Sequence, residues 1–205
     1  MSASFPKSVL LLAAALALGP VAQAQQKPMS TYTTAVDVAI TYVAERAKIA
    51  SVDCGCFWFD GGSGDFALGF YRGLGIAANL TGAHVSNIGS GVTFDKALFA
   101  MGPRYTYTPK LHVGNKAGMA VFGEGLFGGV HGFNSVFPTS TGTISHASSF
   151  AMQFGGGLDL RFAKHLGIRA VEADYVHSTL PNGAGNVQHD LRLSAGVSFH
   201  FSPKP

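Results

Sequence analysis

The sequence predicts an all-β protein, and more narrowly an eight-stranded antiparallel up-and-down transmembrane β-barrel. The first observation is the end of the chain, where apolar and polar residues alternate strictly from Asp190 to Phe201. That pattern indicates a β-strand with one apolar and one polar face, long enough to cross a bilayer at a tilt. The second observation is composition: 27 glycines and 16 phenylalanines accompany only 12% charged residues, whereas about 25% is typical of soluble domains. A surface in contact with lipid needs few charges.

The beginning of the chain has the pattern of a secretory signal peptide. Lys7 precedes an apolar run from Val9 to Leu18, Gly19-Pro20 ends the run, and Ala22-Gln23-Ala24 is a small-x-small cleavage site. We therefore expect a signal peptide over residues 1–24 and a β-barrel domain over residues 25–205. No window holds 18 uninterrupted apolar residues, so the sequence predicts no membrane-spanning helix. If the protein crosses a membrane, we expect it to do so as a closed β-barrel.

Alternation of apolar and polar residues, blurred in places by glycine, divides the remaining chain into eight strands. The predicted strands are roughly 35–44, 65–71, 74–83, 94–107, 117–130, 150–162, 166–177 and 190–201. Short turns near Arg72-Gly73 and Ala163–His165 alternate with long loops, which predicts a periplasmic side with turns and an outer side with loops. The first loop is expected to end at Gly61–Gly64. A bulge is expected at Pro103, which cannot donate to a strand ladder.

Charge and cysteine content exclude several classes of function. A net charge of +3 is weak and dispersed, so nucleic acid is not an expected partner. Cys54 and Cys56 could form a strained local disulfide or remain unpaired, and two thiols alone do not make a metal site. The five histidines near the outer loops could form a zinc or copper site. Because they lack metal-binding spacing, we favour solvated loop histidines. We expect no cofactor and no metal. The five histidines are His84, His131, His146, His177 and His189.

Charged residues on the inward face of the predicted strands point to an interior network. The interior of an eight-stranded barrel is just wide enough to be filled by side chains, and buried charges must pair to offset their desolvation. The favoured interpretation is a polar plug that fixes strand register; the alternative is a narrow gated ion path whose pairs exchange partners. The network is expected to join Arg104, Arg161 and Arg192 with Glu124, Asp159 and Glu172, and the other inward charges are Asp37, Lys96, Asp174 and Asp190.

Three short motifs, in this order along the chain, carry a family resemblance. They are Gly102-Pro103-Arg104, the run Gly155–Asp159, and Ile168-Arg169 followed by Asp174-Tyr175. The sequence resembles the outer membrane protein β-barrel domain family, the OmpA/OmpX-like small eight-stranded barrels. The resemblance implies a monomer in the outer membrane of a Gram-negative cell envelope, with outer-membrane lipid as its surroundings. It also implies insertion by the barrel assembly machinery, with Phe199 and Phe201 as the C-terminal assembly signal.

The segment His84-Val85-Ser86-Asn87 resembles the catalytic step of outer-membrane lipid A deacylases, in which a histidine activates a serine. Asp95 is the candidate for the acid that would orient His84. A polar loop that matches by chance outweighs this interpretation, so His84 and Ser86 are minor candidates and no enzyme is expected. The predicted function is a structural role, or binding and adhesion of a surface ligand through the outer loops. The alternatives are the narrow pore and the lipid A acyl hydrolase.

Overall fold

The computed structural model describes residues 35–48, 55–86, 88, 91–109, 112–113, 117–183 and 185–202. The expected signal peptide, residues 1–24, and Cys54 lie outside these residues, so neither expectation is tested by the structure. None of the described residues belongs to a helix long and apolar enough to cross a membrane.

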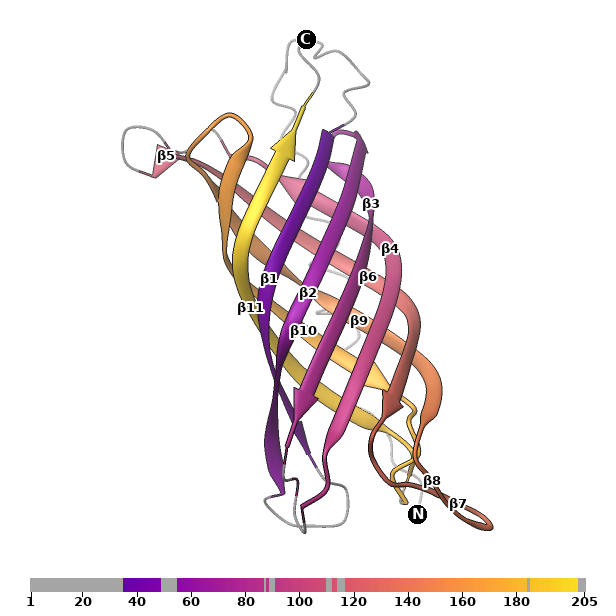
Figure 1. Cartoon of the computed structure of the whole chain (residues 1–205). Coiled ribbons are helices and arrows are strands. Elements are labelled where there is room, and N and C mark those ends of the chain that lie inside the picture. The colour runs from indigo at the N-terminus through magenta and orange to yellow at the C-terminus, as the bar shows by residue number, and fades with distance from the viewer. Residues whose placement is uncertain are drawn as a thin grey trace, which may run out of the picture. The chain divides into compact units, whose positions relative to one another are not determined.

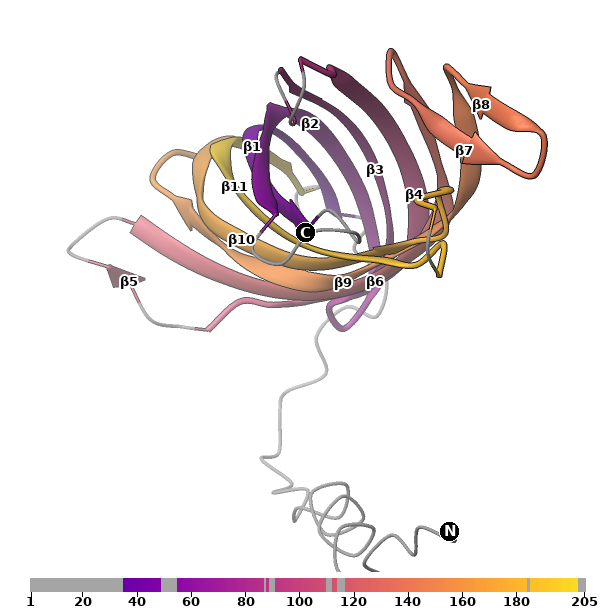
Figure 2. The same ribbon diagram turned by 90° about the horizontal axis from the view of Figure 1, so that it is seen from below.

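Eight long strands form a closed antiparallel barrel (Figure 1), as the alternation predicted. Each pairs with the next long strand along the chain, and β1 pairs with β11 to close the sheet. Figure 2, viewed from below, shows these strands curving around a common interior. Two residues, β5 (His112–Val113), add to the start of β6, and β7 (Phe137–Thr139) and β8 (Gly142–Ile144) form a separate hairpin. The eight long strands are β1 (Ala35–Lys48), β2 (Cys56–Tyr71), β3 (Leu74–Val85), β4 (Phe94–Tyr107), β6 (Ala117–Phe133), β9 (Ala147–Arg161), β10 (Leu166–Ser178) and β11 (Gln188–Phe201).

The two faces of the barrel wall differ sharply in chemistry. Successive side chains of a strand point to opposite faces, and here the inward positions carry most of the described strand charges. The closed ladder satisfies the backbone without water, and the apolar exterior suits hydrocarbon, which are the two requirements for a membrane-spanning sheet. Exposed on the outside are Ile40, Tyr42, Phe66, Phe70, Leu74, Ile76, Leu80, Phe99, Met101, Tyr105, Phe127, Phe154, Ile168, Val171, Tyr175, Leu191, Leu193 and Val197.

The expected long first loop is wrong, because most of it belongs to strands. β1 continues to Lys48 and β2 begins at Cys56, so Gly61–Gly64 lie within the ladder between β1 and β3. Glycine allows β2 and β3 to approach closely here, because a Cβ at Gly61 would lie 2.0 Å from the carbonyl oxygen of Gly82. The glycine run therefore marks close packing between strand backbones. In the sequence alone, such a run cannot be distinguished from a turn signal.

The bulge expected at Pro103 is also wrong. Pro103 pairs with Ile76 in unbroken β3–β4 register, and the β4–β6 register is the same on both sides of it. Register shifts occur instead near Gly69 in β2 and between Arg169 and Glu172 in β10. The β10 shift matters for the interior, because an extra residue lets two positions three apart point to the same side.

Candidate functional site: the barrel interior and the outer rim

Arg169 is the centre of the buried charge network. Its side chain is almost fully enclosed, and Nε donates to Asp159 Oδ1 at 3.0 Å. Nη1 lies 3.1 Å from Asp65 Oδ2 and 3.1 Å from Glu172 Oε2, so one guanidinium links carboxylates from β2, β9 and β10. Ser194 on β11 adds a hydrogen bond to Glu172 at 2.8 Å. Four strands are thereby tied together through one cation.

Arg104 forms the second cationic centre of the interior. Its Nε lies 3.2 Å from Glu124 Oε2, across the β4–β6 pair. The ring of Phe122 lies between the two guanidiniums, 3.7 Å from Cζ of Arg104 and 4.5 Å from Cζ of Arg169. Phe122 thus fills space between the two guanidiniums. Its ring also makes a favourable cation–π contact with each of them.

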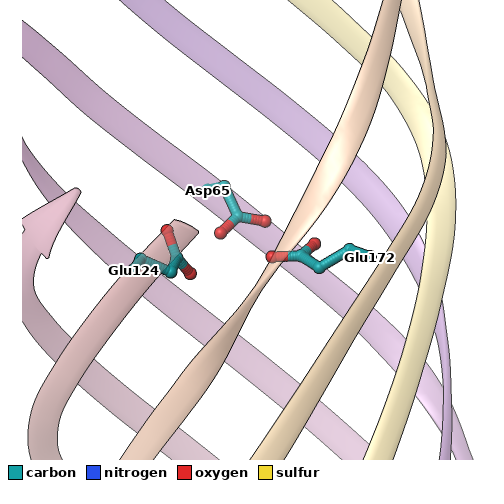
Figure 3. Close-up of side chains that lie close together, drawn as sticks. All are labelled: Asp65, Glu124 and Glu172. Carbon is teal, nitrogen blue, oxygen red and sulfur yellow. The ribbon is translucent and has the colours of Figure 1, made fainter. Parts of the chain in front are cut away.

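Three carboxylates converge in this layer (Figure 3). Ligand oxygens of Asp65, Glu124 and Glu172 all lie within 4.8 Å of one another. Oxygen clusters of this kind can hold a hard cation, but here Arg169 contacts Asp65 and Glu172, and Arg104 contacts Glu124. The guanidiniums already supply the countercharge, so we assign the cluster to the packed network.

A second group of charges lies nearer the loop end of the barrel. Lys96 donates to Glu45 and lies 3.4 Å from Asp190 Oδ2, and its Nζ stands 4.3 Å above the ring of Phe59. Arg192 lies 3.5 Å from Glu45 Oε2. The same guanidinium donates to two polar side chains of β3, Thr81 at 2.8 Å and Asn79 at 3.3 Å.

The outer end of the interior is closed by apolar side chains. The β7–β8 hairpin inserts Phe137, whose ring packs edge-on against Phe94 at 5.5 Å, and Phe94 packs against Phe59 at 5.1 Å. This apolar cap lines the inner faces of β4, β6, β9 and β10, and it includes Leu98, which lies farther from the loop end than Lys96 on β4. Its members include Leu98, Ala100, Leu126, Val130, Phe137, Ala151, Val176 and Leu180.

Five of the six predicted network residues lie in this buried interior, and one does not. Arg104 meets Glu124, Asp159 and Glu172 meet Arg169, and Arg192 meets Glu45. Arg161 does not join them: it lies at the end of the barrel with the short turns, 3.3 Å from Asp37 and beside His200. The reason is position along the strand, since Arg161 is the last residue of β9 and its side chain reaches the barrel opening.

Three charged residues of the network were not predicted from the sequence. Glu45 was assigned to the long first loop, and Asp65 to the start of the second predicted strand without being counted among the inward charges. Arg169 falls on the outward face under strict alternation from Glu172, and only the β10 bulge turns it inward. A basic residue three positions from an acid on an otherwise apolar face is the signal that could have revealed the bulge.

On the outer face near the loop end, His84 and Asp95 meet as the hydrolase hypothesis required. His84 Nδ1 lies 2.5 Å from Asp95 Oδ1, and Asn134 donates to the other carboxylate oxygen. Ser86 is exposed just beyond the end of β3, two residues after His84. The structure thus places a His–Asp pair at this rim with a serine nearby.

The other predicted residues are placed without a test of their roles. Phe199 pairs with Val38 and Leu166 in the wall, and Phe201 stacks on His165 with ring centroids 5.4 Å apart. Both lie at the periplasmic end of β11, and their part in assembly stays a prediction. Cys56 is exposed at the start of β2 and carries a free thiol in the described part of the chain.

Comparison with known proteins identifies the fold and nothing narrower. No family model and no curated protein sequence matches the chain. Among solved structures it is similar to Ail, the attachment invasion locus protein of Yersinia pestis, in complex with the heparin analogue sucrose octasulfate: the TM-score is 0.51 and the identity 18%, over 82% of this chain and 99% of that one. Neisserial surface protein A gives a TM-score of 0.48 and 16% identity, over 82% and 99%. This chain has the fold of the small eight-stranded outer-membrane β-barrels.

Proposed function

We propose that this protein is an integral, monomeric outer-membrane barrel that does not conduct and that binds a surface ligand through its outer rim. Export by a signal peptide over residues 1–24, with the barrel domain over 25–205, is part of this proposal. The observation that carries it is the set of buried contacts across the interior. The Arg169 and Arg104 centres and the Lys96 layer join side chains of different strands by ion pairs, and the apolar cap buries further side chains between the strands. These contacts support an interior filled by side chains.

A filled interior directs binding to the outside. The loop after β6 and the loop after β10 pack together, since Phe137 and Leu180 belong to one buried cluster. The same loops expose apolar side chains, Val136 at 58%, Ile144 at 43% and Val187 at 44%. Loops anchored by buried residues can hold exposed apolar groups in fixed positions, as a preorganised binding surface requires.

The test replaces the exposed apolar groups and leaves the buried anchors in place. Cells that display the wild-type chain, the double variant Val136→Ser/Ile144→Ser, or the control Thr143→Ser would be compared for adhesion to cultured epithelial cells and to immobilised heparin. Heparin is chosen because the similar Ail barrel was solved with a heparin analogue. We expect the double variant to lose adhesion at equal surface abundance while the control keeps it. Equal adhesion of all three, or none above cells lacking the protein, would contradict a binding role for this rim.

A second candidate function, acyl-ester hydrolysis in outer-leaflet lipid, is favoured by one observation. His84 Nδ1 lies 2.5 Å from Asp95 Oδ1. In serine hydrolases an acid orients the general-base histidine through Nδ1 in the same way, and Nε2 of that histidine faces the serine. Ser86 is the nucleophile available on the same strand end. Expression of the wild-type chain would then remove an acyl chain from lipid A, seen by mass spectrometry, and Ser86→Ala would abolish the change. An unchanged lipid A mass with the wild type removes this candidate and leaves the binding proposal standing.

A further inference from the structure

The outer face carries a row of three side chains with metal-binding atoms near the loop ends of β9, β10 and β11. His177 lies directly opposite His189 on β11 and directly opposite Met152 on β9. All three point outward, because their neighbours Val176, Asp190 and Ala151 are buried in the interior. The two imidazole rings have centroids 5.1 Å apart and planes inclined by 43°. The three residues are separated in the sequence, so no short spacing motif predicts that they meet.

The ring nitrogens of this pair are arranged for a further partner. The Tyr175 hydroxyl bonds His189 Nδ1, and the Tyr175 ring stacks on the same imidazole with centroids 5.7 Å apart. This contact fixes the orientation of the His189 ring and leaves Nε2 as its free ligand atom. His177 Nδ1 is buried and has no hydrogen-bond partner among the described residues. A buried polar nitrogen without a partner is uncommon in folded proteins and calls for an explanation.

The other outer histidines differ from this pair. His84 Nδ1 is engaged by Asp95, and His131 Nδ1 is engaged by Ser148. The rings of His131 and His146 are 6.2 Å apart, farther than those of His177 and His189. The pair on β10 and β11 is therefore the one that combines close rings, an oriented imidazole and an unpaired nitrogen.

We propose that His177 and His189, with the thioether of Met152, form a copper site on the outer rim. Two neutral imidazoles and one soft thioether form an uncharged ligand set, which suits Cu⁺ better than the hard cations that require carboxylates. Tyr175 is a positioning residue that acts through His189. The site lies outside the barrel, so it does not depend on whether the interior conducts or on adhesion through the loops.

The test uses the full chain, exported in a bacterial host and purified from outer membranes in detergent without a histidine tag. Cu⁺ would be titrated anaerobically against the chromophoric chelator bicinchoninate. We expect one tightly held Cu⁺ per chain, a loss of affinity of at least tenfold in His177→Gln and in His189→Gln, and a loss of roughly tenfold in Tyr175→Phe. Met152→Leu should weaken Cu⁺ and leave Zn²⁺ binding unchanged. The matched control His131→Gln should bind as the wild type does.

Two results would overturn the proposal. One is wild-type affinity in both histidine variants, with folding verified by the mobility shift on boiling. The other is an equal loss of affinity in His131→Gln, which would indicate diffuse binding by rim imidazoles. X-ray absorption of the copper-loaded wild type gives a readout that needs no variant: two nitrogen neighbours and one sulfur neighbour are expected, and a spectrum without sulfur excludes Met152 as a ligand.

Discussion

Replacing Arg169 by methionine tests whether the interior network holds the barrel together. Methionine replaces the apolar stem of the side chain and removes its charge and donors. Arg169 has three carboxylate partners at 3.0–3.1 Å and is 2% exposed. Removing one partner of a buried ion pair costs about 3–5 kcal/mol, because the opposite charge is left uncompensated. The described interior has more buried carboxylates than buried cations, so no spare cation can take the place of Arg169. We expect Arg169→Met to lower the free energy of unfolding by about 3–5 kcal/mol.

The assay is urea-induced unfolding in lipid vesicles, followed by the fluorescence of Trp58. Trp58 is the one tryptophan of the chain and is exposed on the outside of β2, so its emission reports the change in its surroundings on unfolding. Arg161→Met is the matched control, since Arg161 contacts Asp37 at 3.3 Å with a side chain that is 18% exposed. Because this pair is less buried than Arg169, its loss should cost less than the loss of Arg169; fully exposed pairs contribute about 0–1 kcal/mol.

A double-mutant cycle then separates the pair from general damage. Arg169→Met combined with Glu172→Gln should be less destabilised than the sum of the single variants, with a coupling energy of at least about 1 kcal/mol. The reasoning is refuted if Arg169→Met is no more destabilised than Arg161→Met, or if the cycle shows no coupling.

Three further outcomes are expected. Gly155→Ala should prevent folding to the heat-shifted form, because a Cβ there would lie 2.0 Å from an interior carboxylate oxygen and 2.3 Å from a β10 carbonyl oxygen, whereas Gly82→Ala, with nothing within 4 Å, should fold normally. Phe137→Ala should lower the free energy of unfolding in urea by about 3–5 kcal/mol without creating conductance, since the buried ion pairs of the interior do not involve Phe137. In a Cys54→Ser variant, a membrane-impermeant maleimide should label the exposed Cys56 on intact cells if the loop ends face outward; labelling only after lysis would reverse the topology.

The fold could be predicted because lipid outside and polar groups inside impose period-two alternation on every strand. The last strand shows this clearly, and its order Leu191, Leu193, Ala195, Val197 outward is the order in the structure. Alternation fails where glycine replaces a side chain, which is why the start of β2 was taken for a loop. It also fails at the β10 bulge, which changes the parity of every position beyond it.

The interior partners could not be predicted for a different reason. Alternation assigns a side chain to a face, but partners within the interior depend on strand tilt and on depth along the barrel. Arg161 was grouped with Glu124 and Glu172 because all point inward, yet it lies at the opening, beside Asp37 and His200. The meeting of His177 with His189 follows from the β10–β11 register alone, so the sequence could list these histidines and could not pair them.

The measurement that tests the central claim most directly is the ionic current of the purified wild-type barrel in a planar lipid bilayer. Folding of the same sample is verified beforehand by its mobility shift on boiling. A closed interior, filled by the Arg169 and Arg104 centres, the Lys96 layer and the apolar cap, predicts no stepwise current above the lipid baseline at either polarity. Reproducible unitary openings from folded protein, absent from a boiled sample, would contradict a filled barrel and favour the narrow gated pore.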